Sequence, residues 1–362
     1  MKRADRSILT NWWFQIDLKI LGLIIAFCMV GLLASISSVN LIHKVILFYV
    51  MSAGIFLVVP MVNKKSLIIA GSVVLLVFSL FLFIYTYVDP VVIRGSRRWA
   101  FLLGQSVMPA DLLKPAFVVL TAWFLTKAKS MAKGDFLLDK NLWKNGMWPA
   151  YQGLFLLVLL AMFFHPDLGN MFIYLILFST MLFWAGAKLW YMLAGSGAVL
   201  SLSVVASLIH PHFRTRLLGI GDDFQVQASL NAIRNGGLWG RWEESFLFQE
   251  VPMAATDFIF SGIAEMWGGI FAAALIIAMM VFFIILWRRA VESRDFFTSL
   301  VIIGAATVFA MHVCMNILTA VGLFMKGTTL PFISYGGSSL LSFSLLFAIV
   351  LALIRQEKWN RL

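Results

Sequence analysis

Charged residues are scarce in this chain, and their scarcity excludes an ordinary soluble protein. Only 12% of the 362 residues are Asp, Glu, Lys or Arg, whereas 61% are hydrophobic and the mean hydropathy is +0.93. The apolar share of a typical soluble domain is about 45–50%. The sequence therefore predicts a protein that crosses a membrane several times.

Cysteine is nearly absent as well. Cys28 and Cys314 each lie within an apolar stretch, and no Cys-x-x-Cys or His/Cys ligand spacing occurs. This pattern indicates neither a disulfide framework nor a structural zinc site. No Ala-x-Ala-like cleavage site follows the first apolar stretch, so we expect that stretch to be retained as a helix.

The alternation of apolar and polar residues that marks a membrane-spanning strand is missing too, so the spans are helices. A spanning helix needs about 20 mainly apolar residues. Ten stretches meet or approach this length: 16–38, 41–61, 66–88, 110–126, 148–165, 169–186, 188–209, 258–287, 296–320 and 331–354. We predict an all-α polytopic membrane protein, one transmembrane domain over residues 1–362. Its large extracytoplasmic loop, about 210–257, joins helices 7 and 8.

The positive charge of the chain indicates its topology. The net charge is +11, and with ten helices most Lys and Arg residues fall on the side that holds both termini. The positive-inside rule makes this side cytoplasmic. We therefore expect anionic membrane lipids, and not nucleic acid, as the partners of the basic residues.

Two outward segments carry candidate anion-binding groups. Arg98 and Trp99 lie between the third and fourth stretches, where an Arg fork suits phosphate oxygens. The alternative is a basic loop that touches ordinary lipid headgroups. Asp111 and Lys114 follow at helical spacing. They form either a structural ion pair or, if they face a water-filled cavity, a pyrophosphate site.

The large loop offers weaker signals. Its candidates are Arg214, Arg216 and the pair Gly236–Gly237, where glycine permits close backbone approach to a ligand. The adjacent acids Asp222 and Asp223 could bind a divalent cation, although solvated acids are the commoner case. Between the fifth and sixth stretches, Asp167 is read first as a turn or N-cap residue and second as a functional acid.

Asp257 follows the polar segment 211–256 and precedes the eighth apolar stretch. An acid at the mouth of a spanning helix, beside a large extramembrane loop, is a candidate for a working group. The alternative is capping, because Thr256 is a good N-cap residue and an acid in the first turn complements the helix dipole. The residues alone leave both interpretations open.

Taken together, these motifs resemble the SEDS (shape, elongation, division and sporulation) family. The resemblance extends over nearly the whole chain, and it rests on Arg98-Trp99, Pro109-Ala-Asp-Leu-Leu-Lys114, Pro166-Asp-Leu-Gly169, Asn235-Gly-Gly-Leu-Trp-Gly240, Thr256-Asp-Phe-Ile-Phe260 and Leu330-Pro-Phe-Ile-Ser-Tyr-Gly-Gly-Ser-Ser339. The last motif is closer to the division-type members, FtsW, than to the elongation-type members, RodA.

The resemblance implies a peptidoglycan glycosyltransferase of the bacterial cytoplasmic (inner) membrane that polymerises lipid II during cell division. It also implies a class B penicillin-binding transpeptidase and other division proteins as partners. The catalytic acid of the family maps onto Asp257. The expected substrate-binding residues are Arg98, Trp99, Asp111, Lys114, Asp167, Arg214, Arg216, Gly236, Gly237 and Ser338. A divalent cation, Mg²⁺ or Mn²⁺, could share the charge of the pyrophosphate, but no ligands for it are identified.

Two positions depart from the family pattern. Met253 stands where the family has Glu, and Ala255 stands where it has His, so any supporting role of those groups is lost. Glu250 could compensate for part of this loss. Two other functions therefore stay open: a flippase for lipid-linked precursors, and a catalytically silent scaffold of the division machinery.

Overall fold

The computed structural model describes residues 16–35, 42–88, 91–93, 96–102, 104–131, 147–165, 167–188, 190, 197, 223–242, 254–324 and 327–359. Its helices are α2 (Leu18–Ser35), α3 (Ile42–Val58) with the short 3-10 helix η2 (Val59–Met61), α4 (Lys65–Val88), α5 (Pro109–Met131), α7 (Met147–Phe164), α8 (Leu168–Trp184), α11 (Asp223–Gly236), α13 (Ile259–Glu292), α14 (Phe296–Ala320) and α15 (Gly337–Trp359).

These helices confirm the predicted fold class. Among the described residues, seven helices are long and apolar enough to cross a membrane, counting α3 with η2 as one, and α7 and α8 are shorter apolar helices. Nine of the ten predicted stretches coincide with a described helix. The other, 188–209, lies outside the described residues except for positions 188, 190 and 197. The last helix begins at Gly337, six residues after the predicted start.

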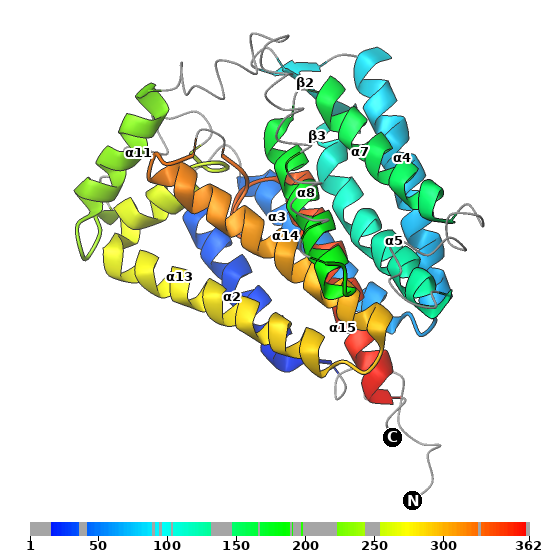
Figure 1. The fold of residues 1–362 in the computed structure, drawn as a ribbon. Coiled ribbons are helices and arrows are strands. Elements are labelled where there is room, and N and C mark those ends of the chain that lie inside the picture. The colour runs from blue at the N-terminus through cyan, green and yellow to red at the C-terminus, as the bar shows by residue number, and fades with distance from the viewer. Residues whose placement is uncertain are drawn as a thin grey trace, which may run out of the picture.

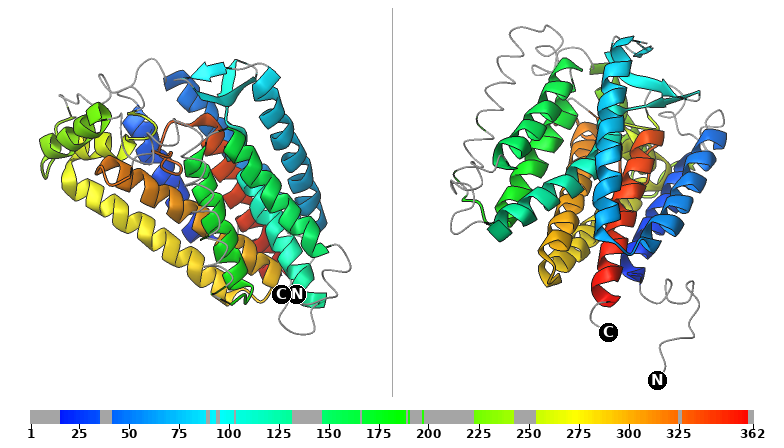
Figure 2. Two further views of the ribbon diagram at one scale, coloured as in Figure 1. Left: turned by 45° about the horizontal axis from the view of Figure 1, so that its top comes forward. Right: turned by 90° about the vertical axis from the view of Figure 1, so that its right-hand side faces the viewer.

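The centre of the bundle consists of α5, α14 and α15. In these helices 78%, 78% and 83% of the apolar window is buried, whereas the share is 17–33% in α2, α3, α4 and α13. Apolar residues on all faces of a helix are tolerated in both places, because lipid and protein interior are equally apolar. Figure 2 shows the peripheral helices α4 and α2 on the outside of the packed central helices.

Polar and non-helical elements gather at one end of the bundle (Figure 1). The predicted loop before α5 is instead a small antiparallel sheet of strands β1 (Val91–Ile93), β2 (Ser96–Leu102) and β3 (Gln105–Val107), in that order. In its register Val91 lies opposite Trp99, and Ala100 lies opposite Val107. The amphipathic helix α11 lies at the same end and packs on α13.

Helix α13 is broken near its start, which the sequence analysis did not foresee. Gly268 has φ 83° and ψ 169°, so residues 259–267 form a separate helical segment. The backbone after α11 occupies the break: Gly269 N–H donates to Gly237 O at 2.8 Å, and Arg241 N–H donates to Glu265 O at 2.8 Å. The freed peptide groups are therefore satisfied by the same chain, as membrane burial requires.

The opposite end carries ion pairs between helices. Asp17 pairs with Arg289 at 2.6 Å, and Lys65 pairs with Asp295 at 2.8 Å. Asp295 also caps α14, where it accepts from Thr298 N–H. The basic partners belong to the set that the positive-inside rule places in the cytoplasm. The charges at this end thus join the first helix and α4 to the hairpin of α13 and α14.

The predicted orientation can be tested with single cysteines introduced into a variant that lacks Cys28 and Cys314. Gln227 is exposed on α11, and Arg294 is exposed in the turn between α13 and α14. If α11 lies outside, Gln227→Cys reacts with a membrane-impermeant thiol reagent in intact cells, and Arg294→Cys reacts only after permeabilisation. The reverse pattern would contradict the assignment of the termini to the cytoplasm.

Candidate functional site

Asp257 lies in the turn just before α13 and is partly exposed. The N-cap residue of the helix is Phe258, which makes no side-chain capping bond, and the first helical turn contains no acid. The interpretation of Thr256 as the cap and of Asp257 as a first-turn acid is therefore wrong. The helix begins two residues later than that interpretation assumed.

The turn that carries Asp257 is bonded to the segment between α14 and α15. Ser334 Oγ donates to Thr256 O at 2.6 Å, and Tyr335 N–H donates to Ala255 O at 2.8 Å. The side-chain amide of Asn316 on α14 donates to Asp257 O at 3.0 Å. These bonds all reach backbone oxygens, so they fix the path of the turn without using the carboxylate.

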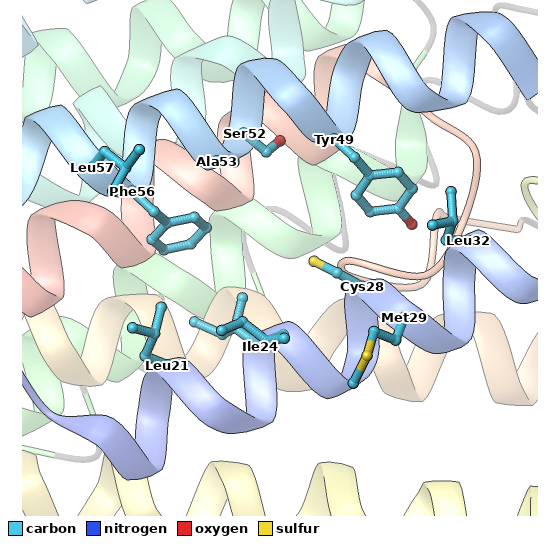
Figure 3. Close-up of a pocket in the computed structure, with 11 residues that line it drawn as sticks. Leu21, Ile24, Cys28, Met29, Leu32, Tyr49, Ser52, Ala53, Phe56 and Leu57 are labelled. Carbon is cyan, nitrogen blue, oxygen red and sulfur yellow. The ribbon is translucent and has the colours of Figure 1, made fainter.

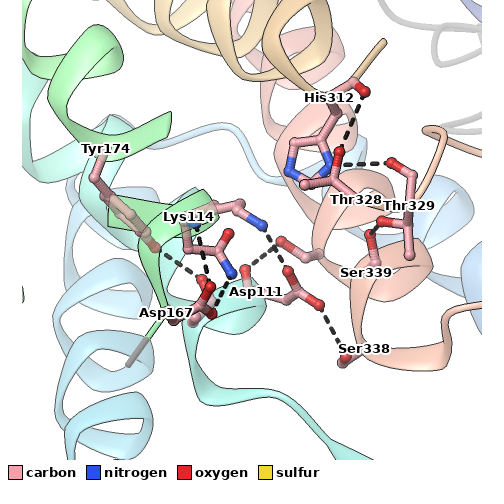
Figure 4. Close-up of polar contacts among 12 residues, drawn as sticks. Asp111, Lys114, Asp167, Tyr174, His312, Thr328, Thr329, Ser338 and Ser339 are labelled. Atoms are coloured by element: carbon pink, nitrogen blue, oxygen red, sulfur yellow. Dashed lines mark hydrogen bonds and ion pairs between the residues drawn. The ribbon is translucent and has the colours of Figure 1, made fainter. Parts of the chain in front are cut away.

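Asp111 and Lys114 form the predicted ion pair in the first turns of α5. Lys114 Nζ lies 2.6 Å from Asp111 Oδ1, and the two residues are 1% and 6% exposed. The other carboxylate oxygen accepts from Ser338 Oγ at 3.1 Å, and Ser342 Oγ donates to Asp111 O at 2.5 Å. The start of α15 therefore completes the shell around Asp111 (Figure 4).

Asp167 and Arg98 lie close to this pair. Asp167 is the N-cap of α8, where it accepts from Asn170 N–H, and Asn170 Nδ2 donates to its other oxygen at 2.8 Å. Its predicted capping role is confirmed. Arg98, on β2, places Nη1 3.8 Å from Asp167 Oδ1, and both side chains are nearly fully buried. The structure thus brings Arg98, Asp111, Lys114, Asp167 and Ser338 to one end of the bundle.

The other predicted residues are placed differently. Trp99 is half-buried on β2. Gly236 is buried, and a Cβ there would lie 2.1 Å from Ala264 O, so this glycine permits a close approach of α11 to α13, while its predicted contact with substrate stays a prediction. Gly237 is exposed with φ +52° in the turn after α11. Arg214 and Arg216 lie outside the described residues, as do Glu250 and Met253.

Sequence reasoning missed His312 and Asn316, which lie one turn apart on α14. Both are buried, at 2% and 0% exposure. His312 Nδ1 is 3.0 Å from Thr329 O, which lies before α15. Polar residues within an apolar span are costly and usually functional. If this rule had been applied to the apolar stretch 296–320, it would have identified both His312 and Asn316 as candidates.

An apolar groove runs between α2 and α3 (Figure 3). Its volume is about 390 Å³, and its lining includes Ile24, Cys28, Ser52 and Phe56. Tyr49, which also lines it, donates its hydroxyl to Phe332 O at 2.8 Å. The groove therefore reaches the segment that holds the Asp257 turn, and Trp99 is not among its lining residues.

The described residues contain no group of three His, Cys, Asp or Glu side chains that could hold a metal ion. Asp222 is outside these residues. A cation site at Asp222 and Asp223 stays a prediction.

The match to known proteins extends over almost the whole chain. Residues 9–359 match the family model described as cell cycle protein, which covers FtsW, RodA and SpoVE. The chain belongs to this family. The family expected from the sequence is confirmed.

Curated relatives carry the names of family members, and the FtsW relatives are named as probable peptidoglycan glycosyltransferases. A probable peptidoglycan glycosyltransferase FtsW from Caulobacter vibrioides is 29% identical over 98% of this chain and 93% of its own length. A probable peptidoglycan glycosyltransferase FtsW from Saccharophagus degradans is 34% identical over 82% of this chain and 77% of its own length. Stage V sporulation protein E of Bacillus subtilis is 30% identical over 80% of each chain. The predicted enzyme class is therefore confirmed.

Solved structures share the fold. A chain from a study of structural coordination of polymerization and crosslinking by a peptidoglycan synthase complex superposes with a TM-score of 0.77 at 23% identity, covering 94% of this chain and 98% of the other. The rod shape determining protein RodA of Thermus thermophilus gives a TM-score of 0.71 at 22% identity, covering 95% and 98%. These matches confirm the polytopic helical architecture.

Removal of one charge from the Asp111–Lys114 pair should destabilise the bundle. In Lys114→Met the buried carboxylate of Asp111 loses its counter-charge, and breaking a buried pair in this way costs about 3–5 kcal/mol. We expect a clear fall in the melting temperature of the detergent-purified protein. The double variant Asp111→Leu/Lys114→Met should regain much of it, because no uncompensated charge is left. An unchanged melting temperature in Lys114→Met would contradict the buried pair.

Proposed function

We propose that this chain is the lipid II polymerase of cell division in the cytoplasmic (inner) membrane, with Asp257 as general base. The observation that carries the proposal is the placement of Asp257. It is partly exposed at the end of the bundle that holds the sheet and α11, and its helix uses another residue as N-cap. This placement supports a carboxylate at the membrane surface, where a lipid-linked sugar would arrive.

In the proposed reaction Asp257 takes the proton of the 4-hydroxyl of the acceptor sugar. The hydroxyl oxygen attacks the anomeric carbon of the donor sugar and inverts it. The bond from that carbon to the pyrophosphate oxygen breaks, and undecaprenyl pyrophosphate leaves with the electron pair. One carboxylate is sufficient, because a pyrophosphate leaving group hardly needs a proton.

Lys114 and Arg98 are the proposed cations for the pyrophosphate, and Asp111 and Ser338 orient Lys114. Both cations are buried and paired in the described state. Substrate must therefore displace part of the shell around them. The groove between α2 and α3 is proposed to take the undecaprenyl tail, because it is apolar and several of its lining residues are exposed to the membrane.

A divalent cation is not assigned to the site. Oxygen ligands in sufficient number would be needed to hold Mg²⁺ or Mn²⁺, and the described residues offer no such group. No step above depends on a metal. Asp167, Arg214, Arg216, Gly237 and Trp99 stay predicted substrate contacts on the grounds of the family resemblance alone.

The proposed partner is a class B penicillin-binding transpeptidase, together with other division proteins. This partner is supported by one structural neighbour, which comes from a study of the structural coordination of polymerization and crosslinking by a peptidoglycan synthase complex. The FtsW names of the relatives favour division over elongation as the process.

The flippase alternative is less well supported. A transporter uses broken helices to expose backbone groups to substrate or ions near the middle of the membrane. The backbone of Leu238 and Gly240 packs against the break at Gly268: a Cβ on Gly268 would lie 2.2 Å from Leu238 O, and Gly269 N–H and Ile270 N–H donate to Gly237 O and Leu238 O. The break therefore serves to seat α11 and not to bind cargo.

The proposal is tested by Asp257→Asn. Asparagine preserves shape but cannot accept the hydroxyl proton, and a general base contributes about 10²–10⁴-fold in rate. We expect the variant, purified with its transpeptidase partner, to bind labelled lipid II and to lose glycan formation by a factor in that range. Asp257→Glu should recover little, because its carboxylate is displaced by about one bond length.

Polymerisation by Asp257→Asn within a few-fold of the wild type would overturn the assignment of the base. Absence of polymerisation by the wild-type complex itself would favour the silent scaffold.

A further inference from the structure

We propose that Asn316 and Gly327 are positioning residues that together fix the carboxylate of Asp257. This inference rests on the proposed role of Asp257 as base and identifies what aims it. Asn316 donates to the backbone carbonyl of the acid, and Gly327, which has no Cβ, leaves space for its side chain. Neither residue carries a group that could itself transfer the proton of the acceptor hydroxyl.

Asn316 joins two separate segments through one amide group. Its Nδ2 donates to Asp257 O at 3.0 Å and to Thr328 O at 2.6 Å. Both protons of the amide are thereby used, and the residue is fully buried. Because Asn316 is on the central helix α14, these bonds tie the turn before α13 and the segment before α15 to that helix. A side chain without hydrogen-bond donors at position 316 would lose the bonds to both Asp257 O and Thr328 O.

Gly327 lies against the side chain of Asp257. A Cβ built on Gly327 would be 2.2 Å from Asp257 Cβ, 2.7 Å from Cγ and 2.9 Å from Oδ2. These are the three nearest atoms that the added group would meet. The φ of Gly327 is not in the left-handed region, unlike that of Gly322. An alanine at 327 is therefore acceptable to the backbone and collides specifically with the catalytic acid.

The two contacts act on different parts of Asp257. Asn316 fixes the carbonyl and so the Cα position, while the missing Cβ of Gly327 leaves room for the Cβ and the carboxylate of Asp257. General-base catalysis requires the carboxylate within hydrogen-bond reach of the hydroxyl. A displacement of about 1 Å in such a group can cost about 100-fold in rate. Both residues should thus affect turnover more than substrate affinity.

The test uses Asn316→Leu and Gly327→Ala in the complex with the transpeptidase partner, assayed with labelled lipid II. Leucine keeps the approximate size of asparagine and removes both donors. We expect kcat to fall about 10–100-fold in each variant, with KM for lipid II changed less than about three-fold. A variant that loses affinity as much as turnover, or that keeps normal kcat, would overturn the positioning role.

Two matched variants control for general damage. Thr307→Val alters another buried polar residue of α14, whose hydroxyl bonds only to Ile303 O of the same helix. Gly71→Ala adds a methyl group on α4 where no other atom lies within 4 Å of the new Cβ. Both should keep kcat and KM near the wild-type values. A loss in these controls equal to that in the test variants would show that the effect is not specific to Asp257.

A double-mutant cycle separates this inference from the proposed function. If both residues act through the carboxylate, then Asn316→Leu or Gly327→Ala should reduce the residual rate of Asp257→Asn by less than about two-fold, because coupled residues are not additive. Full additive loss would contradict the positioning role while leaving Asp257 as base. An active Asp257→Asn protein would instead remove the base itself.

Discussion

The segment that joins α14 to α15 is not helical, so its backbone N–H and C=O groups need hydrogen-bond partners elsewhere in the protein. The bonds that meet this need also hold the site together. Non-helical backbone is tolerated near lipid only where its polar groups find partners in protein or water. Here the partners are the α13 turn, through Tyr335 N–H to Ala255 O, and α14, through Asn316 to Thr328 O. If these bonds were lost, the segment and the Asp257 turn would separate.

The same segment also reaches the buried cations. It continues into α15, whose first residues place Ser338 Oγ on Asp111 and Ser339 Oγ on Thr329. Asp111 in α5 and the turn before α13 that carries Asp257 are far apart in the chain, yet both are bonded to residues 334–338. A small motion of this stretch would therefore move the proposed base and the proposed cations together, which gives a physical reason for its dense side-chain bonding.

The parts of this architecture that were predictable are those set by local composition. Nine apolar stretches gave their helices, and the helical spacing of Asp111 and Lys114 gave their ion pair. The break at Gly268 was not predictable, because it depends on the backbone of Leu238 and Gly240 filling it. The small sheet was missed since its strands of three to seven residues carry little periodic signal. The prediction of Thr256 as N-cap was wrong for a similar reason, because a contact distant in sequence decides the local structure: Thr256 O accepts from Ser334 Oγ.

The effect of the two departures from the family pattern, Met253 and Ala255, depends on whether the site uses side chains or backbone hydrogen bonds at these positions. Ala255 takes part in the site through its carbonyl oxygen, and this contact is the same for any side chain at that position. The bonds to Thr256 O and Asp257 O are also made to backbone. The framework that holds the turn with Asp257 thus survives the replacement of His by Ala. What is lost at positions 253 and 255 is two titratable groups near the acid, and the departure of a pyrophosphate hardly needs a proton from either. The geometry therefore favours an enzyme over a silent scaffold.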